Sequence, residues 1–434
     1  MHTNTAETPN LTVTPRSEHT ISRQSISDAA LKVLYRLKNS GFRGCLVGGG
    51  VRDVLLDKKP KDFDISTDAT PEEVRQLFRN SRIIGRRFRL VHIRFGREII
   101  EVATFRSHTP DSSHTELDDE GRIIRDNSFG NIEQDALRRD FTVNALYYDI
   151  RDFSVLDYVN GLADIKSRTL RLIGDPATRY KEDPVRMLRA VRFAAKLNFK
   201  IDKFADENIF HFGHLLKDIP AARLFEEVVK LFHCGNAVKA FDLLRHYGLL
   251  KYLFPQLALY LENEPDVAML DFLDQALINT DLRLKQGNTV SPAFIFASLL
   301  WPSVNLRAKT LESKELKIVP ALHQAAKEIF VEQVKWISIP RRFSQTAKDI
   351  WTSQPRFTRT RDKQAIRFLS HPVFRASYDF MCIQTMVGLS EKHYCDWWTN
   401  FQTQHKVEKP VSPRKRRNRQ SQKPTAQASQ NSGN

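Results

Sequence analysis

The spacing of apolar residues predicts a mixed α/β segment in the first part of the chain. From Ser27 apolar residues recur at the helical interval of three to four until Gly41. An apolar run at 45–47 then predicts a strand, which a glycine turn separates from a second helix. Further expected elements are strands over 63–65, 90–95, 98–105, 141–150 and 155–158, a helix over 71–78, and an irregular loop over 107–130.

The pattern becomes helical after about residue 171. From Asp183 to about residue 405 nearly every stretch has helical spacing, and prolines separate the helices. The sequence therefore predicts an α/β head with a small mixed sheet, followed by an all-α body and a disordered basic tail. The expected segments are a disordered N-terminus at 1–25, a head at 26–175, a helical neck and body at 176–270, a helical C-terminal domain at 271–405 and a disordered Arg/Lys-rich tail at 406–434.

Charge adds a class of partner to this picture. The 434 residues include 67 Lys and Arg against 51 Asp and Glu, a net charge of +16, which favours a polyanion such as nucleic acid. Eight of the basic residues and a single Glu fall within 406–434. Such a run is equally typical of a solubilising or targeting appendage.

Cysteine usage and hydropathy exclude several classes of protein. Four cysteines, Cys45, Cys234, Cys382 and Cys395, lie far apart and form no CxxC pair, so neither a disulfide framework nor a zinc ribbon is expected. No apolar stretch is long enough to span a bilayer, and the first 25 residues lack a secretory signal. We therefore expect a cytoplasmic protein without a membrane span.

The first candidate chemistry is the sequence Asp62-Phe63-Asp64. In a strand, residues two apart project to the same side, so both carboxylates converge while Phe63 points into the core. Magnesium ions prefer oxygen ligands and commonly take one or two carboxylates together with substrate phosphates. An Asp-x-Asp in an acidic turn is common, so the pair gains meaning only from its surroundings.

A glycine-rich turn precedes this pair. Gly48, Gly49 and Gly50 lie between a predicted strand and a helix, a geometry in which free backbone N–H groups receive phosphate. Arg52 follows in the first helical turn, where it is expected to meet an anion. A tight turn that requires glycine is the alternative explanation.

Two further acidic residues are candidates for a third carboxylate of the site. Glu101 lies on the predicted strand 98–105, and Asp140 follows two arginines. A solvent-facing strand position would explain Glu101 equally well, and a local ion pair would explain Asp140. The residues alone do not choose between them.

A second constellation begins a helix near residue 183. Asp183 is expected as N-cap with Pro184 at the first helical position, and Arg186 follows three residues later. A carboxylate acceptor beside a guanidinium donor suits the hydrogen-bonding edge of a nucleobase. Helix capping with a local ion pair is the simpler alternative.

Four motifs together resemble the class II nucleotidyltransferases, the family that contains tRNA CCA-adding enzymes and bacterial poly(A) polymerases. They are LVGGGVRD at 46–53, DFDI at 62–65, RRDFTVNA at 138–145 and EDPVR at 182–186, and the similarity extends from about residue 26 to 401. Residues 83–93 and the basic run at 414–417 resemble the poly(A) polymerase branch. Residues 219–225 resemble an RNA-binding region of both branches.

This resemblance implies site residues and ligands. Asp62 and Asp64 would be catalytic carboxylates that bind Mg²⁺, as two ions with Mn²⁺ as a substitute, and Glu101 is a further candidate ligand. Asp140 would be the third catalytic acid. The implied nucleotide-binding residues are Gly48, Gly49, Arg52, Arg139, Asp183, Arg186 and Arg189, and the expected RNA-binding residues are Arg414, Lys415, Arg416 and Arg417.

The function expected from these features is template-independent addition of AMP from ATP to RNA 3′ ends. The alternative from the same family is CCA addition to tRNA, and a third interpretation is an inactive RNA-binding protein, which the intact Asp62, Asp64 and Asp140 disfavour. We expect a monomer whose partners are RNA 3′ ends and ATP, with RNA-decay proteins or RNA chaperones as further partners.

Overall fold

The computed structural model describes residues 11–85, 89–107, 115–117, 123–126, 128–263, 265–314 and 316–405. The chain divides into two compact units between Thr352 and Ser353. The domain boundaries predicted at 175 and 270 both lie inside the first unit and stay predictions. The residues expected to form the basic tail lie outside the described part of the chain.

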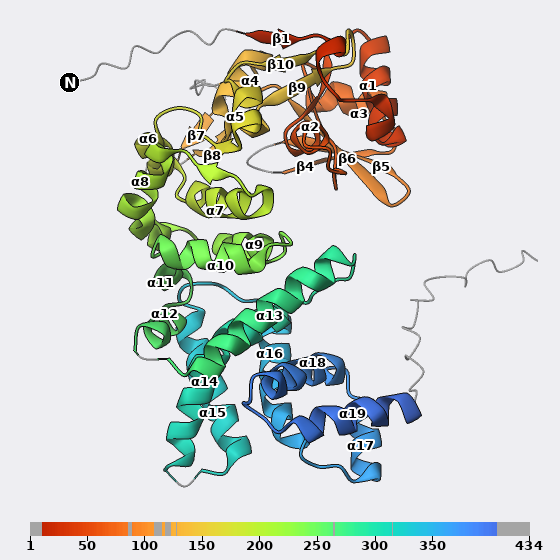
Figure 1. Ribbon diagram of the computed structural model, residues 1–434. Helices are drawn as coiled ribbons and strands as arrows, with labels where there is room; N and C mark the ends of the chain where they lie inside the picture. The colour runs from red at the N-terminus through yellow and green to blue at the C-terminus, as the bar shows by residue number, and fades with distance from the viewer. Residues whose placement is uncertain are drawn as a thin grey trace, which may run out of the picture. The chain divides into compact units, whose positions relative to one another are not determined.

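An eight-stranded mixed sheet forms the head, as the sequence predicts (Figure 1). Strands β3 and β6 are parallel neighbours, and the other pairs are antiparallel. Strands β2 and β9 are central, and all of their residues are buried, which explains their continuous apolar runs. The order is β1 (Thr12–Thr14), β10 (Val155–Asp157), β9 (Leu146–Asp149), β2 (Gly44–Val47), β3 (Asp64–Thr67), β6 (Glu98–Thr104), β5 (Leu90–Phe95) and β4 (Ser81–Ile84).

Short helices begin where the sequence places capping residues. Helix α1 (Asp28–Asn39) is capped by the Ser27 hydroxyl, and α2 (Gly49–Leu55) follows the glycine turn. Helix α3 (Pro71–Leu77) has a complete capping box between Thr70 and Glu73. The remaining helices of the head are α4 (Ile132–Arg138), the 3-10 turn η3 (Thr142–Asn144) and α5 (Gly161–Ser167).

The N-terminal segment differs from its prediction. Residues 11–25, expected to be disordered, include strand β1 and two 3-10 turns, η1 (Arg16–Glu18) and η2 (Arg23–Ser25). Strand β1 pairs with β10, and Ile21 is fully buried. A strand of three residues is too short to show a periodic pattern, and its hydrogen-bond partners lie about 140 residues further along the chain. The strand therefore could not be predicted from the local sequence. The predicted loop at 107–130 likewise contains the strand pair β7 (Thr115–Leu117) and β8 (Ile123–Asp126).

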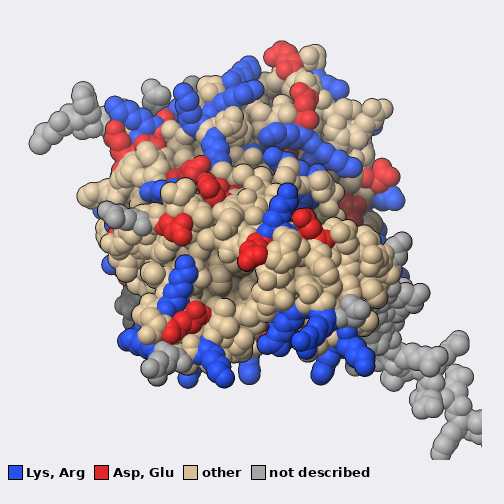
Figure 2. Space-filling model, turned by 60° about the horizontal axis from the view of Figure 1, so that its bottom comes forward, with Lys and Arg blue, Asp and Glu red and all other residues tan. Residues whose placement is uncertain are grey.

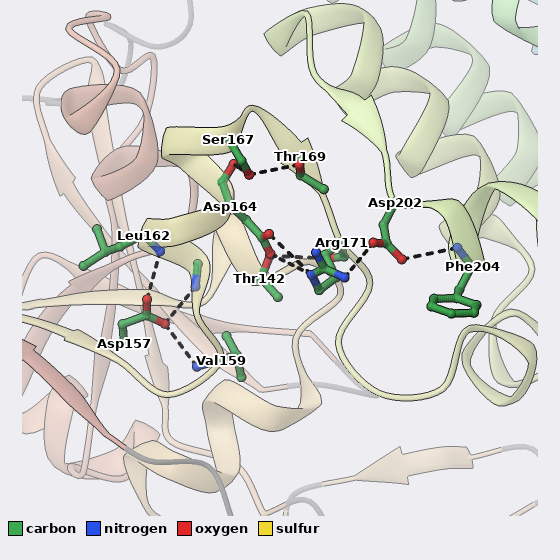
Figure 3. A network of polar contacts seen from close by, with 11 residues as sticks. Thr142, Asp157, Val159, Leu162, Asp164, Ser167, Thr169, Arg171, Asp202 and Phe204 are labelled. Carbon is green, nitrogen blue, oxygen red and sulfur yellow. Dashed lines mark hydrogen bonds and ion pairs between the residues drawn. The ribbon is translucent and has the colours of Figure 1, made fainter. Parts of the chain in front are cut away.

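A polar joint connects the head to the helices that follow (Figure 3). Strand β11 (Thr169–Leu170) pairs in parallel with β12 (Lys200–Ile201). Arg171 donates from Nε to Asp164 of α5 at 3.2 Å and from Nη1 to Asp202 at 2.6 Å. Asp202 also caps helix α8 (Lys203–Phe212) by accepting the Phe204 N–H. The Arg171 guanidinium therefore links α5, the last helix of the head, to Asp202 at the start of the helical body.

The body of the first unit is helical, as predicted. Helices α14 and α15 pack along each other, and the Trp351 indole donates to the Ala297 carbonyl at 3.0 Å. The helices are α6 (Pro176–Glu182), α7 (Val185–Leu197), α8 (Lys203–Phe212), α9 (Ala221–Phe232), α10 (Ala237–His246), α11 (Leu250–Leu253), α12 (Pro255–Glu262), α13 (Val267–Lys285), α14 (Pro292–Glu312), α15 (Ile318–Gln333) and α16 (Arg341–Ser353), with the 3-10 turn η4 (Gly213–Asp218).

The second unit has an aromatic core and corrects one expectation. Its helices are α17 (Asp362–Leu369), α18 (Phe374–Met386) and α19 (Lys392–Gln404), after the 3-10 turn η5 (Gln354–Arg356). Phe357, Phe368, Phe374 and Trp398 pack edge-to-face or tilted at its centre. Cys382 and Cys395 form a disulfide with a Cα–Cα distance of 5.4 Å. No disulfide was expected from their separation along the chain, but α18 and α19 lie side by side and bring them together.

Within the described residues, no helix is both long enough and apolar enough to cross a membrane.

Candidate active site

The paired carboxylates lie at the start of strand β3. Asp64 is its first residue and is half-buried, whereas Asp62 precedes the strand and is exposed. Phe63 between them is buried and lies against Gly50, where an added Cβ would come within 3.3 Å of its ring. The alternation predicted from the sequence, with the aromatic ring inward, therefore holds at Phe63.

Glu101 is the neighbour of this pair across the sheet. Because β3 and β6 are parallel and in register at Asp64 and Glu101, the two carboxylates lie on adjacent strands. The pKa of Asp64 is raised to about 6, mainly by burial and also by the charges of Glu101 and Asp62, while Arg139 opposes them. Glu101 also contacts His92, with Oε1 and Nε2 3.0 Å apart. The site therefore concentrates negative charge that a cation would relieve.

The donor chemistry fits a cation that is shared with a substrate. Among the described residues, no group of three or more His, Cys, Asp or Glu stands in an arrangement ready to hold a metal ion. Magnesium keeps several waters and usually takes one or two protein carboxylates together with phosphate oxygens, rather than a complete protein cage. Asp62, Asp64 and Glu101 are oxygen donors of that kind.

The glycine turn places the next group of residues. Gly48 has φ +66° and ψ −134°, a backbone conformation that favours glycine, and a Cβ there would lie 3.5 Å from Arg139 Nη1. Arg139 is held from behind, since it donates to Asp135 at 3.0 Å, to the Tyr147 hydroxyl at 2.9 Å and to Ser66 at 3.1 Å. The turn and this arginine are thus fixed against each other.

Arg52 differs from its expected position. Its side chain is 2% exposed, donates to Asp53 and to the Asn144 amide oxygen, and lies over the Phe193 ring. The guanidinium therefore braces α2 against η3 and α7 instead of facing an incoming anion. The sequence shows an arginine in the first helical turn, but it does not show that the side chain of this arginine is paired with the neighbouring Asp53.

Asp140 joins the head to helix α7. Its carboxylate accepts from the Phe141 N–H at 2.8 Å, from the Asn144 amide at 3.3 Å and from Arg189 Nε at 2.7 Å. Burial alone would raise the pKa of Asp140, but the ion pair with Arg189 and the hydrogen bonds from Asn144 and the Phe141 N–H together outweigh it, so the pKa lies below its usual value. Of the two candidates for a third carboxylate, the structure places Glu101 beside Asp64 and pairs Asp140 with Arg189.

Asp183, at the start of the helix predicted near residue 183, has a hydrogen-bond partner on another helix that the sequence does not reveal. Asp183 accepts from the Val185 N–H at 3.3 Å, near its expected capping role, although α7 begins at Val185 and not at Pro184. Its other oxygen accepts from Arg223 of α9 at 2.7 Å. Arg186 donates to Glu182 at 2.9 Å and to the Arg179 carbonyl at 2.7 Å, so Asp183 and Arg186 have separate partners.

Arg223 and Asn144 contact candidate site residues, and the sequence did not predict either contact. Asn144 lies within the motif at 138–145, and Arg223 lies within the recognised segment at 219–225. Each acts through a contact with a residue distant along the chain, Asn144 with Arg52 and Arg223 with Asp183. Neither contact follows from local spacing.

A mixed-sheet head that presents clustered carboxylates, joined to a helical body, defines a nucleotidyltransferase fold. The structure of the CCA-adding enzyme from Bacillus stearothermophilus in complex with CTP has the same fold. It aligns with a TM-score of 0.62 and 23% identity over 88% of this chain and 83% of that one.

Family models and relatives identify the branch. The models match as the poly A polymerase head domain at 45–171, the probable RNA and SrmB-binding site of polymerase A at 198–261, and the polymerase A arginine-rich C-terminus at 314–431. Poly(A) polymerase I of Salmonella typhi is 45% identical over 95% of this chain and 92% of its own length. The CCA-adding enzyme of Lactobacillus helveticus is 38% identical, but over 49% of this chain. The chain belongs to the poly(A) polymerase family and is an enzyme of the nucleotidyltransferase class.

Proposed function

We propose that the protein adds AMP from ATP to RNA 3′ ends without a template and releases pyrophosphate. The observation that carries the proposal is the cluster of Asp62, Asp64 and Glu101 at the start of β3 and on the neighbouring strand β6. Phosphoryl and nucleotidyl transfer need positioning and charge stabilisation more than a protein nucleophile, and clustered carboxylates supply both through bound cations.

Asp62 and Asp64 would hold two Mg²⁺ ions, or Mn²⁺ in their place, with Glu101 as a further ligand. Bound cations at this position would lower the pKa of the RNA 3′-hydroxyl and offset the charge of the α-phosphate and of the leaving pyrophosphate. The protein contributes rigidity, because Asp64 is fixed in the β-ladder while Phe63 anchors the segment in the core.

The residues around the glycine turn would position the nucleotide. Gly48 leaves space free of a side chain beside Arg139, and Gly49 does so beside Arg52. The Arg139 guanidinium is held by Asp135, Tyr147 and Ser66. Arg139 would therefore meet the nucleotide in a fixed orientation. Arg52 would support the site indirectly, because it donates to the Asn144 amide oxygen and so fixes the Asn144 amide, which in turn donates to Asp140.

Helix α7 would read the base of the nucleotide. Asp183 offers an acceptor whose direction is set by Arg223, and Arg186 offers donors from the next helical turn. Arg189, paired with Asp140, would hold this reading helix at the head. The arrangement suits the hydrogen-bonding edge of a base, since a charged acceptor and donor sit near one helix start.

The nucleotide used distinguishes the two branches of the family. Purified protein with Mg²⁺, a labelled RNA that lacks any tRNA fold, and each nucleoside triphosphate alone should give long products with ATP only. Extension restricted to tRNA, by CTP and then ATP, would establish the CCA-adding alternative. No extension with any triphosphate would overturn both.

RNA partners and cellular role follow from the same proposal. Lys and Arg side chains are spread over the face seen in Figure 2, with acidic groups between them. We assign RNA backbone contacts to such side chains and, beyond the described residues, to Arg414, Lys415, Arg416 and Arg417. A cytoplasmic, monomeric enzyme of RNA processing and decay is the role that we propose.

A further inference from the structure

Residues 83–93 resemble the poly(A) polymerase branch, but the function proposed above gives them no part. His92, in the middle of β5, is in register with Glu101 of the neighbouring strand β6 (Figure 1). Glu101 is in turn in register with Asp64 of β3. One row of side chains across three adjacent strands therefore joins this segment to the candidate metal site.

This row lies on the open face of the sheet. Residues in register on neighbouring strands project to the same side, and residues one position away project to the other. The adjacent row, which consists of Val91, Val102 and Ile65, is at most 1% exposed. The side chains of His92 and Glu101 are instead 28% and 49% exposed. The buried row fixes the strands, and the open row remains accessible to a ligand.

His92 restrains the Glu101 carboxylate. His92 Nε2 and Glu101 Oε1 are 3.0 Å apart, which is a hydrogen-bonding distance. An ionised carboxylate only accepts hydrogen bonds, so the ring nitrogen is the donor. Within the part of the chain that the structure describes, Glu101 has no other hydrogen bond or ion pair. The contact therefore limits the rotation of this side chain and leaves its second oxygen available as a ligand.

Glu101 needs such a restraint more than Asp64 does. Asp64 is short and half-buried, whereas Glu101 has one more methylene group and is exposed. A group that hydrogen-bonds to a metal ligand sets its direction, and loss of that group typically lowers metal affinity or activity by about ten- to a hundredfold. A cross-strand pair without such a role would stabilise the fold by only about 0.2–1 kcal/mol.

We propose that His92 is a positioning residue of this enzyme, which holds the Glu101 carboxylate in the direction in which it binds a cation beside Asp64. The inference rests on the proposed function, because that function assigns Glu101 to the cation site. It adds that the segment resembling the poly(A) polymerase branch supplies a hydrogen-bond donor to that site. His92 acts through Glu101 and is not itself a ligand.

The test measures Mn²⁺ binding to the full chain from the electron paramagnetic resonance signal of the free ion. His92→Gln keeps an N–H donor at about the reach of Nε2, whereas the shorter amide of His92→Asn does not reach Glu101. We expect His92→Asn to raise the Mn²⁺ dissociation constant about tenfold, and His92→Gln to keep it within about threefold of the wild-type value. In a Glu101→Gln background, His92→Asn should cause little further change, because the two residues act as a pair.

Controls separate positioning from a folding defect. His393→Gln is the matched control, since the exposed His393 of the second unit contacts Glu391 with Nδ1 and Oε2 3.1 Å apart, and it should leave Mn²⁺ binding unchanged. Thermal unfolding identifies any variant that folds poorly, and His92→Leu replaces His92→Asn if the latter does. AMP incorporation reports the proposed function separately. In His92→Asn the Mg²⁺ concentration for half-maximal incorporation should rise about tenfold, while the rate at saturating Mg²⁺ changes little.

Unchanged Mn²⁺ affinity in a folded His92→Asn protein overturns the inference, even when ATP-dependent extension proceeds. A loss that His92→Gln shares in full, or that persists in the Glu101→Gln background, also overturns it, because His92 then acts in another way than through Glu101. If the Mn²⁺ measurements follow the expected pattern but no RNA is extended, the proposed function fails and the role of His92 at the cation site stands.

Discussion

Asp62 and Asp64 can be changed with little effect on the packing of the head, because the core contact of this segment is made by Phe63. Asp62→Asn and Asp64→Asn keep side-chain volume but remove the charge that would bind cations. We expect each to lower AMP incorporation more than about a hundredfold while RNA affinity is unchanged. Single-turnover extension and RNA titration measure the two effects.

Asp28→Asn is the matched control for these two changes, since Asp28 is exposed on α1. Near-normal extension by either Asp62→Asn or Asp64→Asn would remove that residue from the proposed metal site.

The raised pKa of Asp64 predicts a pH-dependent stability. The folded pKa of about 6 lies above the ordinary value of 3.8, so folding takes up a proton between these pH values and stability falls as pH rises through them. Asp64→Asn removes this cost. In metal-free buffer with chelator it should stabilise the chain by up to about 3 kcal/mol above pH 6 and have no effect below pH 3.8. Urea unfolding across this range measures it, and a pH-independent gain would contradict the assignment.

Arg223 is predicted to control base selection through Asp183. Arg223→Ala leaves the Asp183 carboxylate without its charged partner, which costs about 1–3 kcal/mol in binding. We expect a higher KM for ATP and weaker discrimination against CTP and GTP, with kcat less affected. Arg245→Ala, on the exposed face of α10, is the control. Unchanged KM values with lower thermal stability alone would assign Arg223 a structural role.

Helix α7 contacts the head beside the proposed nucleotide site through the ion pair of Arg189 with Asp140, so we expect this contact to affect how α7 docks. Arg189 pairs with Asp140 and lies over the Phe193 ring. Arg189→Ala should lower the free energy of unfolding by about 1–3 kcal/mol and raise the KM for ATP, because Asp140 and α7 lose their common anchor. Urea unfolding and initial rates test both, and Arg189→Lys should restore part of the loss. An effect on neither would show that docking depends on other contacts.

Element types could be predicted from the sequence wherever a local signal exists. The helix at Pro71 was predicted from its cap, and the strand at Asp64 from alternation around Phe63. Strand β1 could not be predicted, because three residues gain their stability from β10 far along the chain. The same limit applies to the Cys382–Cys395 disulfide. Long-range pairing leaves no trace in spacing.

In the candidate site, too, features with a local sequence signal could be predicted and long-range contacts could not. The residue types and their order predicted the carboxylates and the glycine turn as candidate site residues, because cation and phosphate binding favour those residue types. The ion-pair and hydrogen-bond partners of the charged residues could not be predicted from the sequence. Arg52 is the clearest case, because it donates to Asp53 and Asn144 and does not face the anion that was expected there. That Glu101 lies beside Asp64 on the neighbouring strand likewise became visible only with the β3–β6 register.

At the scale of the whole molecule, charge is expected to act through the RNA backbone. Residues 406–434 hold eight of 67 basic side chains, and the remainder of the chain still has a net charge of about +9. Truncation after His405 should weaken RNA binding and flatten its salt dependence, since log K falls by about 0.7 per neutralised phosphate of a single strand for each unit of log salt. Titrations from low to moderate salt compare the two proteins, and identical slopes would exclude the tail from RNA binding.

Strand β1 has a consequence for any shortened form of this chain. Its three residues cover the outer edge of β10, whose backbone groups would otherwise be free to pair with a strand of another molecule. A chain begun at residue 26, the head boundary that the sequence suggests, would keep every proposed catalytic group but expose that edge. We expect such a chain to aggregate during expression and storage. A low specific activity of that preparation would then reflect the loss of folded protein and not a defect in the catalytic groups.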